Sequence, residues 1–132
     1  MNDTPERALH EAESWLVSAK HTLMDAEEED AKITVCCAQA IHALIRANDA
    51  LSLKSFGHKS TRHEDAAALF AKLVREKKLP DKAIRFKDLI STAMRDKSGA
   101  DYGKGSFSYE DAKLYVERTE NFITMVKDVL KI

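Results

Sequence analysis

The sequence predicts an all-α protein, folded as one domain in which five helices form an up-and-down bundle. Apolar residues recur at the 3.6-residue spacing of amphipathic helices along most of the chain. No segment alternates apolar and polar residues with enrichment in β-branched side chains, which is the pattern of a half-buried strand. Four glycines and two prolines in 132 residues leave few places for a helix to end. A chain of this length buries a sizeable core without disulfides or a metal.

The first two helices are expected over about residues 5–28 and 30–54. Thr4 supplies a hydroxyl N-cap, and Pro5 follows at a position where a helix loses no hydrogen bond. The second helix should stop near Gly57. Because it is apolar around almost its whole circumference, it is predicted to be the central helix of the bundle.

Three further helices are expected, over about residues 62–78, 81–98 and 108–131. Thr61 with Glu64 fits a capping box at the start of the third helix, and Ser108 with Asp111 can cap the fifth. The apolar stripe of the fourth helix is expected to include Ile84. Large apolar residues from all five helices should form one core: Trp15, Ile41, Leu44, Phe70, Ile90 and Phe122.

The composition is that of an ordinary globular protein, with 44% hydrophobic residues, 33% charged residues and a net charge of −1. No apolar run approaches the roughly 18 residues that a membrane span needs. The N-terminal stretch "MNDTPER" lacks the apolar segment of a secretory signal, so a cytoplasmic location is expected. Cys36 and Cys37 are adjacent in a helical pattern, which disfavours an ordinary disulfide and predicts two reduced, buried thiols.

Charge is distributed unevenly along the chain. Residues 1–30 carry nine acids and two bases, a net of −7, whereas residues 54–87 carry ten bases and four acids, a net of +6. Three interpretations are open: the basic part binds phosphate, two copies dock with opposite charges facing, or both are solvated helix faces. The second interpretation, together with the apolar circumference of the 30–54 helix, predicts a homodimer.

Two polar groups stand out as candidate site residues. Within the 30–54 helix, four polar side chains share one stripe at positions i, i+3, i+7 and i+10: Gln39, His42, Arg46 and Asp49. This stripe is either the only solvent-facing strip of a buried helix or the floor of a polar groove. The second group lies in "MRDKSGADYGKGSF", residues 94–107, which holds three of the four glycines: Arg95, Asp96, Asp101 and Tyr102.

Glycines on either side of Asp101 and Tyr102 allow a sharp turn that would aim both side chains back toward the bundle. The sequence therefore predicts that the 94–107 group meets Arg46 and Asp49 in a polar groove at the end of the fourth helix. Either Arg95 forms a structural ion pair there with Asp101 or Asp49, or the groove binds a phosphate or nucleotide.

Three segments, taken in order, resemble the HEPN domain: "CCAQAIHALIRANDALSL", "GHKSTRHEDAAALF" and the "R…ADYG" connector. The resemblance covers about residues 5–130 and is closest to the branch associated with minimal nucleotidyltransferases. It implies a five-helix bundle, commonly dimeric, and a nucleotidyltransferase as partner in a toxin–antitoxin-like, stress or defence setting. Many HEPN domains are metal-independent ribonucleases with a motif of Arg, then Asn, Asp or His, then four residues and a catalytic His.

In this chain Arg95 matches the motif arginine and Asp96 its polar neighbour, but Asp101 occupies the histidine position, followed by Tyr102. An exposed aspartate, with an ordinary pKa of about 3.9, is a poor proton donor at pH 7, and its charge repels a scissile phosphate. The resemblance therefore implies a non-catalytic binding module for a nucleotide or RNA phosphate rather than an enzyme.

The alternative is a metal-independent ribonuclease whose acid/base is displaced to His63 or His42. His63 belongs to a basic loop with Lys59 and Arg62, where a histidine before a helix can cap it, bind phosphate or transfer a proton. No cofactor and no metal site are predicted. His58 and His63 are five residues apart, which suits neither one helical face nor a usual zinc pair.

Overall fold

The computed structural model describes residues 3–60, 62, 65–76, 78–102 and 106–131, with only the backbone of Asp101 and Tyr102. These residues form five α-helices and one 3₁₀ helix and contain no strand, so the all-α prediction is confirmed. The elements are α1 (Pro5–Ala26), α2 (Asp30–Phe56), α3 (Ala66–Arg75), the 3₁₀ helix η2 (Asp81–Arg85), α4 (Phe86–Tyr102) and α5 (Tyr109–Leu130).

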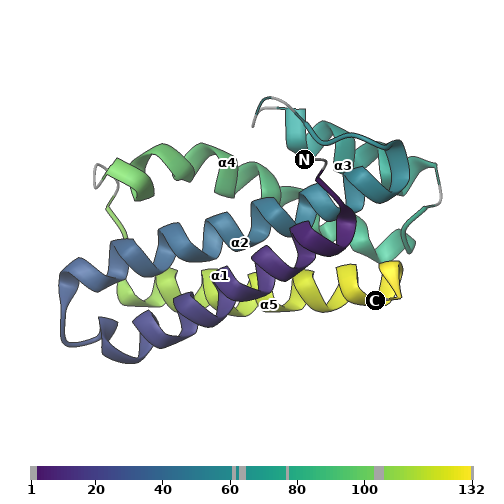
Figure 1. Cartoon of the computed structure of the whole chain (residues 1–132). Coiled ribbons are helices and arrows are strands. Elements are labelled where there is room, and N and C mark those ends of the chain that lie inside the picture. Colours follow the sequence, from purple (N-terminus) through teal and green to yellow (C-terminus); the bar gives the residue numbers. More distant parts are fainter. Residues whose placement is uncertain (1–2, 61, 63–64, 77, 103–105, 132) are drawn as a thin grey trace.

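The four long helices alternate in direction along the chain, and α2 is the central one (Figure 1). It contacts each of the other four α-helices, as its apolar circumference predicts. The short α3 lies at the end of the bundle where both chain termini are found (Figure 1). The end of α4 lies at the opposite end of the bundle, over the first half of α2 (Figure 1).

Three predicted helix ends are confirmed by their hydrogen bonds. The Thr4 hydroxyl oxygen accepts from the backbone N–H of Arg7 at 3.1 Å, with proline in the first turn. Ser108 and Asp111 form a complete capping box, in which each side chain accepts from the other residue's backbone N–H, at 3.1 and 2.8 Å. Gly57 closes α2 in the left-handed region with φ of 78°, a conformation that favours glycine.

Two helix boundaries differ from the prediction. The predicted capping residues Thr61 and Glu64 lie outside the described residues, and α3 begins at Ala66 rather than near 62. The fourth segment starts as a 3₁₀ helix and then continues as α4 to Tyr102, through Gly99. A helical glycine costs only about 1 kcal/mol relative to alanine, and the buried Ala100 anchors the last turn. Asp101 and Tyr102 therefore end a helix and do not begin a connector.

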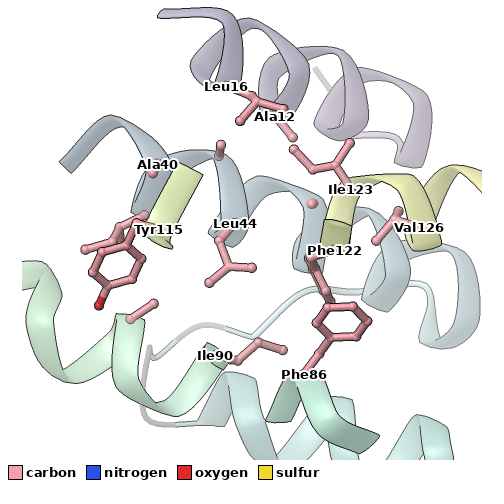
Figure 2. Packing of buried hydrophobic residues seen from close by; sticks show 14 of the residues in the cluster. Ala12, Leu16, Ala40, Leu44, Phe86, Ile90, Tyr115, Phe122, Ile123 and Val126 are labelled. Carbon is pink, nitrogen blue, oxygen red and sulfur yellow. The ribbon is translucent and has the colours of Figure 1, made fainter. Parts of the chain in front are cut away.

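Five of the six predicted core residues are completely buried: Ile41, Leu44, Phe70, Ile90 and Phe122. The Phe122 ring meets those of Phe70 and Phe86, with centroids 5.8 and 5.3 Å apart, and Figure 2 shows Phe122 next to Phe86.

The prediction for Trp15 is wrong, since its side chain is 38% exposed. Leu16 and the alanines of α1 face α2 in its place, and the Trp15 ring stacks on His42 with centroids 4.8 Å apart. The prediction that Ile84 belongs to the buried apolar stripe is also wrong. Ile84 is exposed, because η2 turns its neighbour Ala83 inward.

Both thiols are free and completely buried, as predicted. The Cys36 thiol donates to the backbone oxygen of Ala19 at 3.4 Å, which reflects the close approach of α1 and α2. Burial raises the pKa of Cys36 to about 11 and that of Cys37 to about 12. None of the described helices combines the length and apolar character that a bilayer span requires.

Candidate functional site

The described residues of the predicted groove take part in two different sets of contacts. Arg46 and Asp49 lie in the second half of α2, where Arg46 binds Asp3 of the N-terminal segment. Asp96 accepts a hydrogen bond from Tyr115 of α5. Its charge also adds to the burial that raises the pKa of Cys37, a residue of α2 about two and a half turns before Arg46. Because α4 runs antiparallel to α2, later residues of α4 meet earlier residues of α2 (Figure 1). The described contacts therefore do not join Asp96 to Arg46, and the side chains of Asp101 and Tyr102, on which the predicted groove also depends, lie outside the described residues.

Arg46 is the centre of a dense ion-pair network. Its guanidinium donates to Asp3 at 3.0 and 3.1 Å, to Glu11 at 2.7 Å and to Asp49 at 2.8 Å. The side chain of Arg46 is only 15% exposed, and Asp49 is buried, so neither belongs to a solvent-facing strip. The polar stripe of α2 is covered by α1 and by the N-terminal segment. Its charged members hold these parts of the chain together.

The electrostatics of this network match its geometry. Hydrogen bonds from Arg46 lower the pKa of the Asp3 carboxyl below its ordinary value. Burial raises the pKa of Asp49, and the attraction of Arg46 offsets only part of that effect. Lys59, a predicted phosphate ligand, pairs with Asp3 at 3.3 Å. The two cations Arg46 and Lys59 are thus both engaged by carboxylates.

The predicted histidines do not gather around Arg95. His42 lies half-buried between α2 and Trp15 of α1, whereas Arg95 lies on α4. His63 lies outside the described residues. His58 is exposed and lies against the Phe56 ring, with centroids 6.1 Å apart. Arg62, also exposed, pairs with Asp65 at 3.5 Å.

A cleft of about 580 Å³ opens between α4 and α5, and we call it the α4–α5 cleft. Its lining is both apolar and charged. The apolar residues are Phe86, Leu89, Phe107 and Leu114, and the polar residues are Arg85, Asp88, Thr92, Asp96, Ser106, Asp111, Tyr115, Arg118 and Asn121. Of the predicted site residues whose side chains the structure describes, Asp96 alone is found in this lining, and the next residue on α4, Arg95, is exposed.

Two of the acids in the cleft already accept hydrogen bonds from fixed donors. Tyr115 donates its hydroxyl to the Asp96 carboxylate, and Figure 2 shows that hydroxyl at the edge of the core, facing α4. Burial and the Asp96 charge raise the pKa of Tyr115, and nearby Arg95 partly opposes them. Asp111 accepts from the Ser108 backbone. The acidic end of the cleft is therefore held rigidly.

The arginines of the cleft differ from Arg46. In the part of the chain that the structure describes, Arg85, Arg95 and Arg118 form no ion pair, although Arg85 lies 5.1 Å from the Phe86 ring centre. Arginines without a carboxylate partner keep their planar donor groups available for an anion.

Sequence reasoning missed Arg118 and Tyr115, although a signal was present. Asp111, Tyr115 and Arg118 follow one another at i, i+4 and i+7, which places them on one face of α5. The apolar residues of that helix predict its buried face, and they do not indicate a polar face beside it.

Among the described residues, no group of three or more His, Cys, Asp or Glu side chains is close enough to hold a metal ion. A scan against protein-family models finds no match to this chain, and a search of curated proteins finds none either. The case for the α4–α5 cleft as a site therefore depends on its geometry: a rigid acidic end, apolar walls and arginines that form no ion pair with the described residues.

Proposed function

We propose that the protein is a non-catalytic, HEPN-like binding module whose α4–α5 cleft takes a nucleotide. The observation that carries the proposal is the group of arginines, Arg85, Arg95 and Arg118, which line or adjoin one cleft and form no ion pair among the described residues. Arg85 and Arg118 line the cleft and Arg95 adjoins it. A guanidinium without a carboxylate partner keeps its donors available for a phosphate.

The other walls of the cleft suit the rest of a nucleotide. Leu89, Phe107 and Leu114 offer apolar surface to a base, and the volume of about 580 Å³ lies in the range of small-molecule sites. Asp96 and Asp111 can accept hydrogen bonds from ribose hydroxyl or base amino groups. The same carboxylates repel a continuous phosphate backbone, which favours a mononucleotide over a stretch of RNA.

Binding is a better account than cleavage. Asp101 occupies the position of the HEPN catalytic histidine, and an aspartate in water, with an ordinary pKa of about 3.9, is a poor proton donor at pH 7. The histidine that the structure describes on α2, His42, lies against α1 rather than beside Arg95. The order of five helices, with Arg95 and Asp96 near the end of α4, supports the HEPN-like assignment.

A nucleotidyltransferase partner and a homodimer stay predictions. The apolar circumference of α2 is covered within one chain by α1, α4 and α5, so it no longer argues for a dimer. The opposite charges of residues 1–30 and 54–87 still do.

The proposal is tested by calorimetric titration of the protein with AMP, GMP, ribose 5-phosphate, inorganic phosphate and a short RNA. We expect a mononucleotide to bind more tightly than phosphate or RNA. Arg118→Ala and Arg95→Ala should each weaken binding about tenfold or more, because a hydrogen bond to a charged group contributes about 1.5–3 kcal/mol. Arg75→Ala, which removes an exposed arginine of α3, is the matched control and should bind normally.

Two results would contradict the proposal. One is nucleotide binding that is unchanged in both cleft variants. The other is cleavage of total RNA by the unmodified protein in the presence of chelator, with Arg95→Ala inactive, which would favour the ribonuclease alternative.

A further inference from the structure

A second cavity, of about 340 Å³, lies between α2, α4 and the segment that follows α2, and we call it the Asn48 pocket. Apolar side chains, among them Ile45 and Met94, form most of its walls. The polar part consists of Asn48 and Asp49 on α2 with Lys59 and Ser60. The lining shares no residue with the α4–α5 cleft.

Asn48 is the unusual residue of this pocket. It is only 3% exposed, and its side-chain oxygen Oδ1 has no hydrogen-bond partner among the residues that the structure describes. A buried polar atom without a partner lowers the free energy of unfolding by about 1–3 kcal/mol, because its lost hydration is not replaced. An apolar residue of similar size has no such penalty. Such atoms are few in native proteins, and each calls for a physical explanation. Here the orphaned acceptor belongs to a residue that lines an open cavity.

The charges around the pocket argue against an anion as its ligand. The guanidinium of Arg46 is bound to three carboxylates, among them Asp49 at 2.8 Å. Lys59 is held by Asp3 at 3.3 Å. With both cations paired, the unmet requirement of the pocket is a hydrogen-bond donor for Asn48. Because Asp49 already accepts a hydrogen bond from Arg46, the donor that Asn48 requires need not carry charge.

We propose that the Asn48 pocket binds a flat, neutral nitrogen heterocycle of the nucleobase class through its N–H groups. An N–H of the ring or of an amino substituent donates to Asn48 Oδ1, and the ring lies against the apolar walls that include Ile45 and Met94. The volume of about 340 Å³ accommodates a bicyclic ring and falls at the lower end of small-molecule sites. This inference does not depend on the function proposed for the α4–α5 cleft.

The test uses the full chain, labelled with ¹⁵N, and adenine as the probe. Adenine should shift the side-chain amide resonances of Asn48, which are identified by their loss in Asn48→Leu. An analogue without any N–H, 6-dimethylamino-9-methylpurine, should bind at least tenfold more weakly. Asn48→Leu should lose at least tenfold in adenine affinity and unfold at a higher temperature, because it removes the orphaned acceptor.

A second variant keeps the test decisive if Asn48→Leu does not fold. Met94→Phe narrows the pocket and leaves Asn48 unsubstituted. This variant should also lose adenine binding. Arg118→Ala, in the other cleft, should bind adenine normally, so the two proposals fail separately. The inference is overturned if adenine leaves the Asn48 resonances unmoved, because adenine then does not bind beside Asn48. It is also overturned if either pocket variant binds adenine as the unmodified protein does.

Discussion

Arg46 and Arg118 are arginines on two long helices of one bundle, yet their surroundings are opposite. Arg46 is largely buried and donates to three carboxylates from two other parts of the chain and its own helix. Arg118 is exposed at the α4–α5 cleft and forms no ion pair with any residue that the structure describes. The first arginine holds parts of the fold together, and the second is the one to which we assign a ligand in the proposed function. Among the described residues, the number of carboxylate partners distinguishes the two arginines.

The largest difference between the two regions should appear in stability. Arg46→Ala leaves Asp3, Glu11 and Asp49 without their shared cation, and breaking a buried ion pair costs about 3 kcal/mol or more. Arg118→Ala should change the free energy of unfolding by less than about 0.5 kcal/mol. Urea denaturation of both variants measures the difference. Equal losses in the two variants would show that Arg118 also has a structural role.

A smaller effect should come from Tyr115, at the rigid end of the cleft. Tyr115→Phe removes the hydroxyl that donates to Asp96 and should cost about 1–2 kcal/mol at pH 7. The raised pKa of Tyr115 means that its stabilising contribution is complete below pH 10 and is lost as the pH rises further. The variant should therefore lose less stability than the unmodified protein between pH 10 and 11.

Thermal unfolding of Tyr115→Phe across that range measures the effect. Cys36 and Cys37 contribute to alkaline unfolding in both proteins, because their thiols ionise near pH 9 once unfolded. The informative quantity is the difference between the two curves. Parallel curves would mean that Tyr115 ionises equally easily in the folded and unfolded chains.

The smallest effect should appear in acid, in the Arg46 network. Arg46 lowers the pKa of Asp3, so the stability that Asp3 contributes is complete above its ordinary pKa of 3.8 and is lost as the pH falls below it. Asp49 acts in the opposite direction, since its pKa is raised by burial. Asp3→Asn should therefore flatten the loss of stability between pH 5 and pH 2. A steeper loss in the variant would mean that Asp3 does not depend on Arg46.

The features of the fold that could be predicted from the sequence are those formed by residues close together along the chain. Thr4 before Pro5, and Ser108 before Asp111, cap their helices through contacts within four residues, so the sequence displays both partners together. The core residues Phe70 and Phe122 are each part of a regular apolar stripe.

The incorrect predictions concern residues whose surroundings depend on parts of the chain far away in sequence. Trp15 and Leu16 are adjacent apolar residues, and which of them faces α2 depends on how α1 rotates to bring its alanines close to that helix. Arg46 looked available because its partner Asp3 lies 43 residues away, in a segment without a motif. The α4–α5 cleft is formed by residues of two helices, and no local sequence pattern predicts how these helices lie relative to each other.

The two adjacent buried thiols of α2 can report when α1 and α2 separate. A thiol that has no exposed surface and a pKa of about 11 or 12 does not react with a disulfide reagent near neutral pH. Reaction must wait until the helices separate, so its rate measures how often this part of the bundle opens rather than how reactive the sulfur is. A ligand that ties α4 to α5, without touching α1, should slow that reaction only if the whole bundle opens as one unit. The sulfur chemistry of Cys36 and Cys37 thus distinguishes local opening from global unfolding in a chain without any added label.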